Sequence, residues 1–282
     1  MAMIKVEGLV LKGTDFSETS RIVTLWTLEK GKMRALAKGA RRLKSPFENS
    51  LDLLNRCQFQ LIEKSSGALD LLTESRVHEG FSGLREHLPN LYAGYHVAEL
   101  LNDGTQDHDP HPGLYEASLI VLWQLANEPR AARKAGKLSP EAAWNLMRFE
   151  FVYLEETGYH PDFSHCAGCG QVPTPGQPAW HFFADMGSAA CESCSPSIHR
   201  TSNSGNLNKP GGFNRPLFRP SSTSAVMSIS PDALDVASNL GNREASTGPP
   251  PERVRSEVRA LLNHYLTWLR GRRPKLVGFL GS

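Results

Sequence analysis

The sequence predicts an α+β protein of several domains: an N-terminal OB-type β-barrel, an all-helical body and an inserted four-cysteine module that resembles a zinc ribbon. Three observations predict this fold class. Short strand-length apolar runs fill residues 1–80, helical periodicity marks 81–160 and 225–282, and two Cys-x2-Cys pairs lie within 161–194. We expect a flexible loop at 195–224, because 18 of its 30 residues are Ser, Pro, Gly or Asn.

The first 80 residues alternate apolar runs with turn residues. The runs are VEGLVL, RIVTLWTL, MRALAK, CQFQLI and LDLLTE, and Gly, Asp, Asn and Ser separate them. Five short strands in so little chain favour a small Greek-key barrel over a sheet covered by helices. An OB-type barrel is the natural candidate, although the spacing alone leaves an SH3-like barrel open.

Apolar residues then recur every three or four positions, which predicts helices over 83–102, 112–128 and 139–157. The third helix begins with Ser139 as its N-cap, followed by a proline at the first helical position. Four aromatic residues make it apolar on nearly every side: Trp144, Phe149, Phe151 and Tyr153. It is therefore expected to be the buried central helix. A short break at 241–251 precedes a last helix from about Glu252 to Arg270.

The two cysteine pairs are the sharpest chemical signal. Their spacing is C-x2-C-x21-C-x2-C, and the four ligands are Cys166, Cys169, Cys191 and Cys194. Each pair can present two thiolates to one metal, and four thiolates close a tetrahedral zinc site with no position left for water. We therefore expect structural zinc (Zn2+) rather than a catalytic centre. Between the pairs, 180–183 is expected to be a strand and 186–188 a turn, which would return the second pair to the first.

Two disulfides are the alternative use of these cysteines, but nothing indicates an oxidising compartment. Three nearby histidines are less favoured substitute ligands: His165, His181 and His199. The fifth cysteine, Cys57, lies in a strand-like run and is expected to be a core residue.

A run of seven cations without an intervening acid is the second signal: Lys30, Lys32, Arg34, Lys38, Arg41, Arg42 and Lys44. On a strand pair and its connecting loop, such cations can bind nucleic acid phosphates regardless of base sequence. The predicted phosphate contacts are Lys38, Arg41, Arg42 and Lys44, with Lys32 and Arg34 assisting. The alternative is a solvated charged face.

Aromatic residues that could stack on bases in this region are Phe16, Trp26, Phe47 and Phe59. For Trp26 and Phe59, a place in the barrel core is the favoured interpretation. At the other end of the chain, Arg270, Arg272, Arg273 and Lys275 either extend a basic track or complement the dipole of a helix end.

The net charge of +2 is unevenly divided. Residues 1–80 and 251–282 carry +3 and +5, whereas 81–160 and 161–250 carry −5 and −1, which indicates local basic patches on a nearly neutral body. The sequence has no phosphate-binding loop, nucleophile elbow or HExxH motif, so no enzymatic activity is expected and no catalytic residue is assigned. It also shows neither a membrane-length apolar stretch nor an export signal, so we expect a cytoplasmic protein without membrane contact.

Several sequence segments resemble those of a known protein family. These are EGLVLKGTDFSETSRIVTLWTLEKGK at 7–32, LAKGARRLKS at 36–45, and CAGCG with CESC in the cysteine module. Together with the order of parts, they resemble the RecO family of bacterial recombination mediators, over nearly the whole chain except 195–224. The tail RRPKLVGFLGS matches the family pattern only loosely.

This resemblance implies an OB-fold that binds single- and double-stranded DNA and anneals complementary strands. It also implies contact with RecR and with single-strand-binding protein, help in loading RecA in the RecF pathway of DNA repair, and a place at the bacterial nucleoid. A protein-interaction adaptor, with structural zinc and incidental DNA contact, is the alternative function from a different class. A zinc-dependent hydrolase is disfavoured because four thiolates leave no open metal position.

Overall fold

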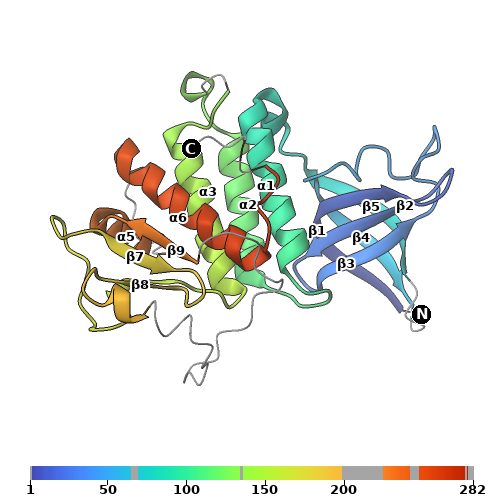
Figure 1. Ribbon diagram of the computed structural model, residues 1–282. Helices are drawn as coiled ribbons and strands as arrows, with labels where there is room; N and C mark the ends of the chain where they lie inside the picture. The colour runs from blue at the N-terminus through green and yellow to red at the C-terminus, as the bar shows by residue number, and fades with distance from the viewer. Residues whose placement is uncertain are drawn as a thin grey trace. The chain divides into compact units, whose positions relative to one another are not determined.

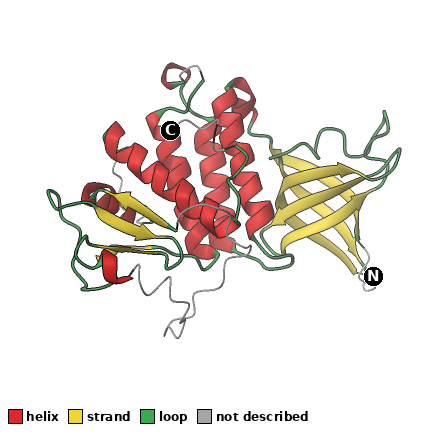
Figure 2. Ribbon diagram, in the orientation of Figure 1, coloured by secondary structure: helices red, strands yellow, loops and turns green. Residues whose placement is uncertain are grey.

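The computed structural model describes residues 2–64, 69–133, 136–198, 225–241, 248–276 and 278. The chain divides into two compact units, Met1–Gly136 and Lys137–Ser282, whose elements are drawn in Figures 1 and 2. The sequence instead suggested domain limits at 80, 160, 194 and 224, and these limits stay a prediction. Among the described residues, every helix is too short or too polar to cross a bilayer.

Five strands form a closed barrel in the order β1-β2-β3-β5-β4 (Figure 1, blue to cyan). They are β1 (Ala2–Asp15), β2 (Arg21–Thr27), β3 (Gly31–Ala37), β4 (Arg56–Glu63) and β5 (Asp70–Glu79). All pairs are antiparallel except β3 with β5, and β1 closes the barrel by pairing with both β2 and β4. This strand order with one parallel pair is that of an OB barrel, so the topology decides between the two barrel types that strand spacing left open.

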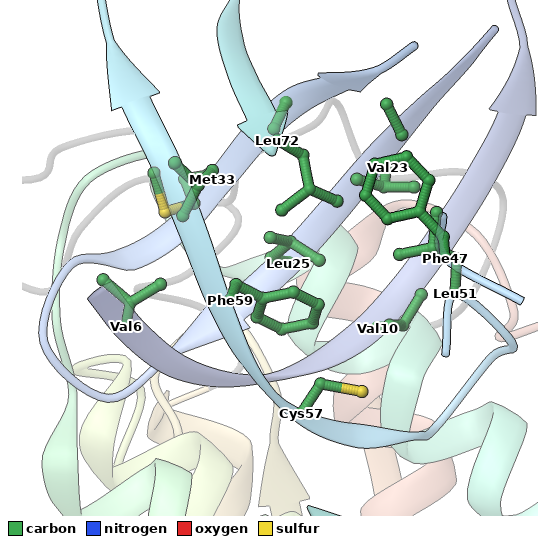
Figure 3. Close-up of a cluster of buried hydrophobic side chains, with 13 residues drawn as sticks. Val6, Val10, Val23, Leu25, Met33, Phe47, Leu51, Cys57, Phe59 and Leu72 are labelled. Atoms are coloured by element: carbon green, nitrogen blue, oxygen red, sulfur yellow. The ribbon is translucent and has the colours of Figure 1, made fainter. Parts of the chain in front are cut away.

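The barrel interior is filled by alternate residues of the strands, as a half-buried sheet requires. Val23 and Leu25 of β2 face inward, and so do Met33, Ala35 and Ala37 of β3. The connection between β3 and β4 adds two more core side chains, Phe47 and Leu51, which point toward the strands in Figure 3. This connection is therefore anchored in the core rather than lying loosely on the barrel. Cys57 is fully buried in the same cluster, as predicted.

Helical segments complete the first unit: η1 (Ser82–Glu86), α1 (Leu88–Gly104), α2 (Pro112–Ala126) and η2 (Arg130–Ala132). The predicted helix at 83–102 is interrupted at His87, whose backbone is extended. Pro89 explains the break, because a proline ring clashes with the carbonyl four residues earlier in a continuous helix. The connection between α1 and α2 lies against β3. A Cβ at Gly31, which has φ +65°, would be 2.2 Å from the Asp109 carbonyl oxygen, so this turn requires glycine.

The second unit combines helices with a small sheet. Its elements are α3 (Pro140–Glu156), β6 (Asp162–Cys166), β7 (Trp180–Phe183), β8 (Ser188–Ala190), β9 (Val226–Ile229), α5 (Pro231–Ser238) and α6 (Glu252–Arg270). The sheet order is β6-β8-β7-β9. The Ser139 hydroxyl accepts a hydrogen bond from the Ala142 N–H and so caps α3, as predicted. The four aromatic residues of α3 are buried, also as predicted.

Some features of this unit differ from the sequence predictions or lie outside the described residues. The short helix α5 lies in the predicted helical region 225–282 but was not predicted as a separate element, although Ser230 caps it and Pro231 begins it. Residues Val226–Ile229 of the same region form the strand β9 instead. Of the predicted loop at 195–224, residues 195–198 are helical, and 199–224 lie outside the described residues. The same is true of 242–247 within the predicted break at 241–251.

A buried ion pair joins α3 to α6 in the second unit. The Arg259 guanidinium donates to the Glu150 carboxylate, and both side chains are almost completely buried. Burial lowers the pKa of Arg259, because desolvation disfavours its charged form. Each charge therefore depends on its partner, since an uncompensated ion in the interior costs several kcal/mol.

Replacing Glu150 alone tests this dependence. Glu150→Leu should lower the free energy of unfolding by about 3–5 kcal/mol, because Arg259 stays buried without a counter-charge. The double variant Glu150→Leu/Arg259→Met should lose much less, because neither charge remains. Urea unfolding followed by circular dichroism measures both variants. A double variant as unstable as the single one would contradict the account.

Candidate metal centre and basic loop surface

The four cysteines converge at one end of the small sheet. Cys166 is the last residue of β6, and the parallel pairing of β6 with β8 places it beside Ala189, two residues before Cys191. Each Cys-x2-Cys pair forms a tight turn, with the Gly170 N–H donating to the Cys166 carbonyl (2.8 Å) and the Cys194 N–H to the Cys191 carbonyl (3.1 Å). The four sulfur atoms all lie within 4.8 Å of one another. The predicted ligands are therefore brought together.

The sulfur spacing fits a tetrahedral metal. Cys166 and Cys191 have their sulfurs 3.7 Å apart, and those of Cys169 and Cys191 are 3.9 Å apart. Four sulfurs at about 2.3 Å from a zinc ion are separated by about 3.8 Å in a regular tetrahedron. A disulfide needs about 2.05 Å, and all four cysteines are free thiols. The geometry thus favours the metal over the disulfide alternative.

Backbone groups support negative charge on the sulfurs. The N–H groups of Gly168 and Cys191 donate to the Cys166 sulfur at 3.4 and 3.3 Å. Although burial opposes ionisation, these and neighbouring hydrogen bonds lower the pKa of Cys166 to about 6. By contrast, hydrogen bonding with Cys191 raises the pKa of Cys194 to about 12. A dication would favour the four-thiolate form.

One glycine and three histidines describe the surroundings of the site. Gly168 leaves room for the second pair, because a Cβ there would lie 2.8 Å from the Cβ of Cys194. The clustered ligand atoms belong to cysteines alone within the described part of the chain. His165 bonds instead to the Ser164 hydroxyl (2.8 Å), His181 is not in the cluster, and His199 lies outside the described residues.

The predicted DNA-binding cations separate into two groups. Lys32 is only 9% exposed, and its ammonium donates to the carbonyls of Asn102 (2.7 Å) and Thr105 (2.6 Å) at the end of α1. Asp107 lies 3.5 Å from the same ammonium and 3.1 Å from the Arg34 guanidinium. Lys32 therefore joins β3 to α1 instead of facing solvent. Arg34 remains exposed but is paired with an acid.

The remaining four cations lie at one end of the barrel. We define the loop surface as the β1–β2 loop, residues 16–20, together with residues 38–49 of the β3–β4 connection. Lys38, Arg42 and Lys44 are exposed there, and no acid of the described residues forms an ion pair with them. A hollow of about 710 Å³ lies in the connection, and its charged lining residues are three cations, Arg41, Arg42 and Lys44, and one acid, Glu48. This hollow offers a place for anionic groups.

Arg41 has a different role, because it joins the two loops. Its backbone N–H donates to the Thr19 carbonyl (3.1 Å), and its guanidinium donates to the Ser17 carbonyl (2.8 Å). The same guanidinium is 3.4 Å from the Asp15 carboxylate. Asp15, just before the β1–β2 loop, also pairs with Arg21, just after the loop, at 3.2 Å. Sequence reasoning missed these inter-loop contacts, although an acid before a hairpin loop and a cation after it were a signal.

Only one of the four candidate aromatic side chains reaches the surface. Phe47 and Phe59 are barrel core, and Phe16 is 62% exposed in the β1–β2 loop. Trp26 is buried, as expected, but outside the barrel interior, where it stacks on His111 with ring centroids 6.2 Å apart. Leu43, which lies between two cations, is fully exposed and was not singled out from the sequence.

Comparison with known proteins covers both units. Residues 1–81 match the family model "Recombination protein O N terminal" and residues 85–209 match "Recombination protein O C terminal". A DNA repair protein RecO from Rhodopirellula baltica is 34% identical over 282 residues, covering 97% of each chain. One from Myxococcus xanthus is 30% identical over 98% of this chain and 96% of its own length. One from an Anaeromyxobacter species is 34% identical over 71% of this chain and 74% of its own.

Metal analysis of two cysteine variants tests the proposed ligands. The purified protein should hold about one zinc ion per chain, and Cys166→Ser should lose it, because the remaining three thiolates bind zinc more weakly. The loss should lower the stability of the β6–β8 region. Cys57→Ala is the matched control, since Cys57 lies in the barrel core and should leave the zinc content unchanged. Retention of zinc and of the melting temperature in Cys166→Ser would contradict the assignment.

Proposed function

The chain belongs to the RecO family of DNA repair proteins, and from this premise we propose that it is a non-enzymatic recombination mediator. It binds single- and double-stranded DNA, anneals complementary strands and acts with RecR to load RecA onto DNA bound by single-strand-binding protein. The observation that carries the proposal is the group of exposed cations on the loop surface of an OB barrel, where Lys38, Arg42 and Lys44 form no ion pair with the described acids. OB barrels bind oligonucleotides with the face of strands 2 and 3 and with the loops between strands 1 and 2 and between strands 4 and 5. The first of these loops belongs to the loop surface.

The loop surface supports DNA binding through phosphate contacts. Lys38, Arg42 and Lys44 would neutralise phosphates, and each contact releases condensed counterions into solution. Arg41 contributes charge and also keeps the two loops together, so it is a positioning residue as well as a candidate contact. Lys32 does not take part in this proposal, because its ammonium is already satisfied by α1 carbonyls.

Annealing follows from charge neutralisation. Two complementary strands repel each other through their phosphates, and cations that bind one strand reduce the repulsion felt by the second. No bond in the DNA is made or broken, so the process needs no catalytic residue. A bound zinc ion would hold the turns of the cysteine module in place, through Cys166, Cys169, Cys191 and Cys194, and would take no part in the annealing.

An adaptor function is the second candidate, and one observation favours it. Ile120 and Trp123 are exposed on α2 and are three residues apart, so they lie on the same side of the helix. Exposed large apolar side chains of this kind occur at protein interfaces. Binding to partner proteins by a protein that fails to bind DNA would favour the adaptor.

Salt dependence of binding tests the phosphate contacts. Four contacts on a single strand predict that log K falls against log salt with a slope of about −3. Arg42→Ala/Lys44→Ala should reduce the slope by about 1.4, because two contacts are lost. Fluorescence anisotropy of a labelled oligonucleotide at several salt concentrations measures both values.

Lys30→Ala is the matched control for this experiment. Lys30 is also exposed, but it pairs with Glu63 at 3.2 Å and lies at the opposite end of the β2–β3 hairpin. Its loss removes one charge and should leave the slope unchanged. If the double variant kept the slope of the unmodified protein, Arg42 and Lys44 would not be phosphate contacts.

A further inference from the structure

Two large apolar side chains stand exposed on the loop surface. Phe16 is 62% exposed, and Leu43 is fully exposed between Arg42 and Lys44. The same β3–β4 connection buries Phe47 and Leu51 in the barrel core, whereas its Leu53 is 37% exposed. Part of the connection is therefore packed in the water-free core of the barrel, whereas the side chain of Leu43 lies outside that core. Exposed apolar residues among cations fit a ligand that is anionic and has apolar faces.

Hydrogen bonds hold the backbone near both residues. The Phe16 N–H donates to the Ser20 carbonyl (3.1 Å) and closes the β1–β2 loop. On the other loop, the Arg42 N–H donates to the Gly39 carbonyl (3.1 Å) and forms a turn just before Leu43. Arg41 links the two loops through the Thr19 and Ser17 carbonyls, as described above. Phe16 and Leu43 are thus carried by two loops that are bonded to each other.

We propose that Phe16 and Leu43 form a stacking subsite for unpaired bases, which gives the loop surface a preference for single strands over duplex. This inference rests on the proposed DNA binding and adds a specificity that phosphate contacts cannot supply. Cations contact phosphates in either form of DNA. Base faces are different, because they are covered by their neighbours in a duplex and available in a single strand. An aromatic ring stacks on any base, so the subsite is tolerant of sequence.

The charge around the subsite selects this occupant over an apolar protein segment. Cations flank Leu43 directly on both sides, and the loop surface carries four cations against two acids, Glu18 and Glu48. A nucleotide presents a phosphate and a base a few ångströms apart, so it can satisfy a cation and an apolar side chain at once. A purely apolar partner would leave the cations facing it without counter-charges.

Three probes of equal length test the subsite at one salt concentration: a thymidine oligonucleotide, the same strand with abasic sites at its centre, and a blunt duplex. The full-length protein should bind the intact strand at least about fivefold more tightly than the abasic strand, which has the same phosphates. Phe16→Ala should lose at least about fivefold on the intact strand and almost nothing on the abasic strand or the duplex. Its salt slope should stay unchanged, because no phosphate contact is lost.

Control variants separate stacking from other effects. Phe16→Tyr retains a ring and should bind like the unmodified protein, whereas Phe16→Leu retains apolar area without a ring and should be weakened. Leu43→Ala should weaken binding to the intact strand selectively, as Phe16→Ala does. Val172→Ala removes an exposed apolar side chain from the second unit and should leave binding to all three probes unchanged.

The possible failures are distinguishable. Salt-dependent binding with equal affinity for the intact and abasic strands would overturn the subsite and leave the phosphate contacts standing. An equal loss by Phe16→Ala on all three probes would also overturn it, because the effect would then not depend on base faces. Absence of binding to every probe at low salt would overturn both the subsite and the proposed DNA binding.

Discussion

The first unit depends on the closure of its barrel, and closure depends on one strand that pairs along both edges. β1 pairs with β4 through Ala2–Leu9 and with β2 through Gly8–Asp15. The pairing with β2 shifts register between Val10 and Lys12, and such irregularities bend a strand. Within this barrel, the antiparallel pairing of β2 with β3 places Arg21 opposite Ala37, so the start of β2 and the end of β3 lie at the same rim. The β1–β2 loop and the β3–β4 connection therefore meet, and the loop surface is a consequence of the strand order.

The sequence predicted local structure well and long-range pairing less well. Short apolar runs located the five strands, and the cysteine spacing located the four cysteines that cluster, because both are patterns within a short stretch of chain. The parallel pairing of β3 with β5 could not be read from spacing. The role of Lys32 could not be predicted either, since its carbonyl partners are 70 and 73 residues away and belong to a helix end. A run of cations in the sequence shows where the charges are, but it does not show which of these side chains face solvent.

In the second unit, too, a contact between residues far apart in the sequence could not be predicted, and here it is a buried ion pair. Glu150 and Arg259 are 109 residues apart, and each reads in the sequence as an ordinary charge on a helix. The structure places both in the interior, where they compensate each other. The small sheet of the same unit has strands of only three to five residues, yet its aromatic side chains Phe163, Trp180, Phe182 and Phe183 are fully buried. A metal held by four thiolates would add stability at the end of the sheet where the cysteines lie.

The contacts that Arg41 makes between the loops have a kinetic consequence for a DNA surface of the kind proposed. Loops that are already bonded to each other need not be ordered when a strand arrives, so association requires little conformational entropy. Encounter is then governed by diffusion and by attraction to the cations rather than by a slow loop rearrangement. A strand can be captured and released repeatedly on such a surface, which suits a search for a complementary partner.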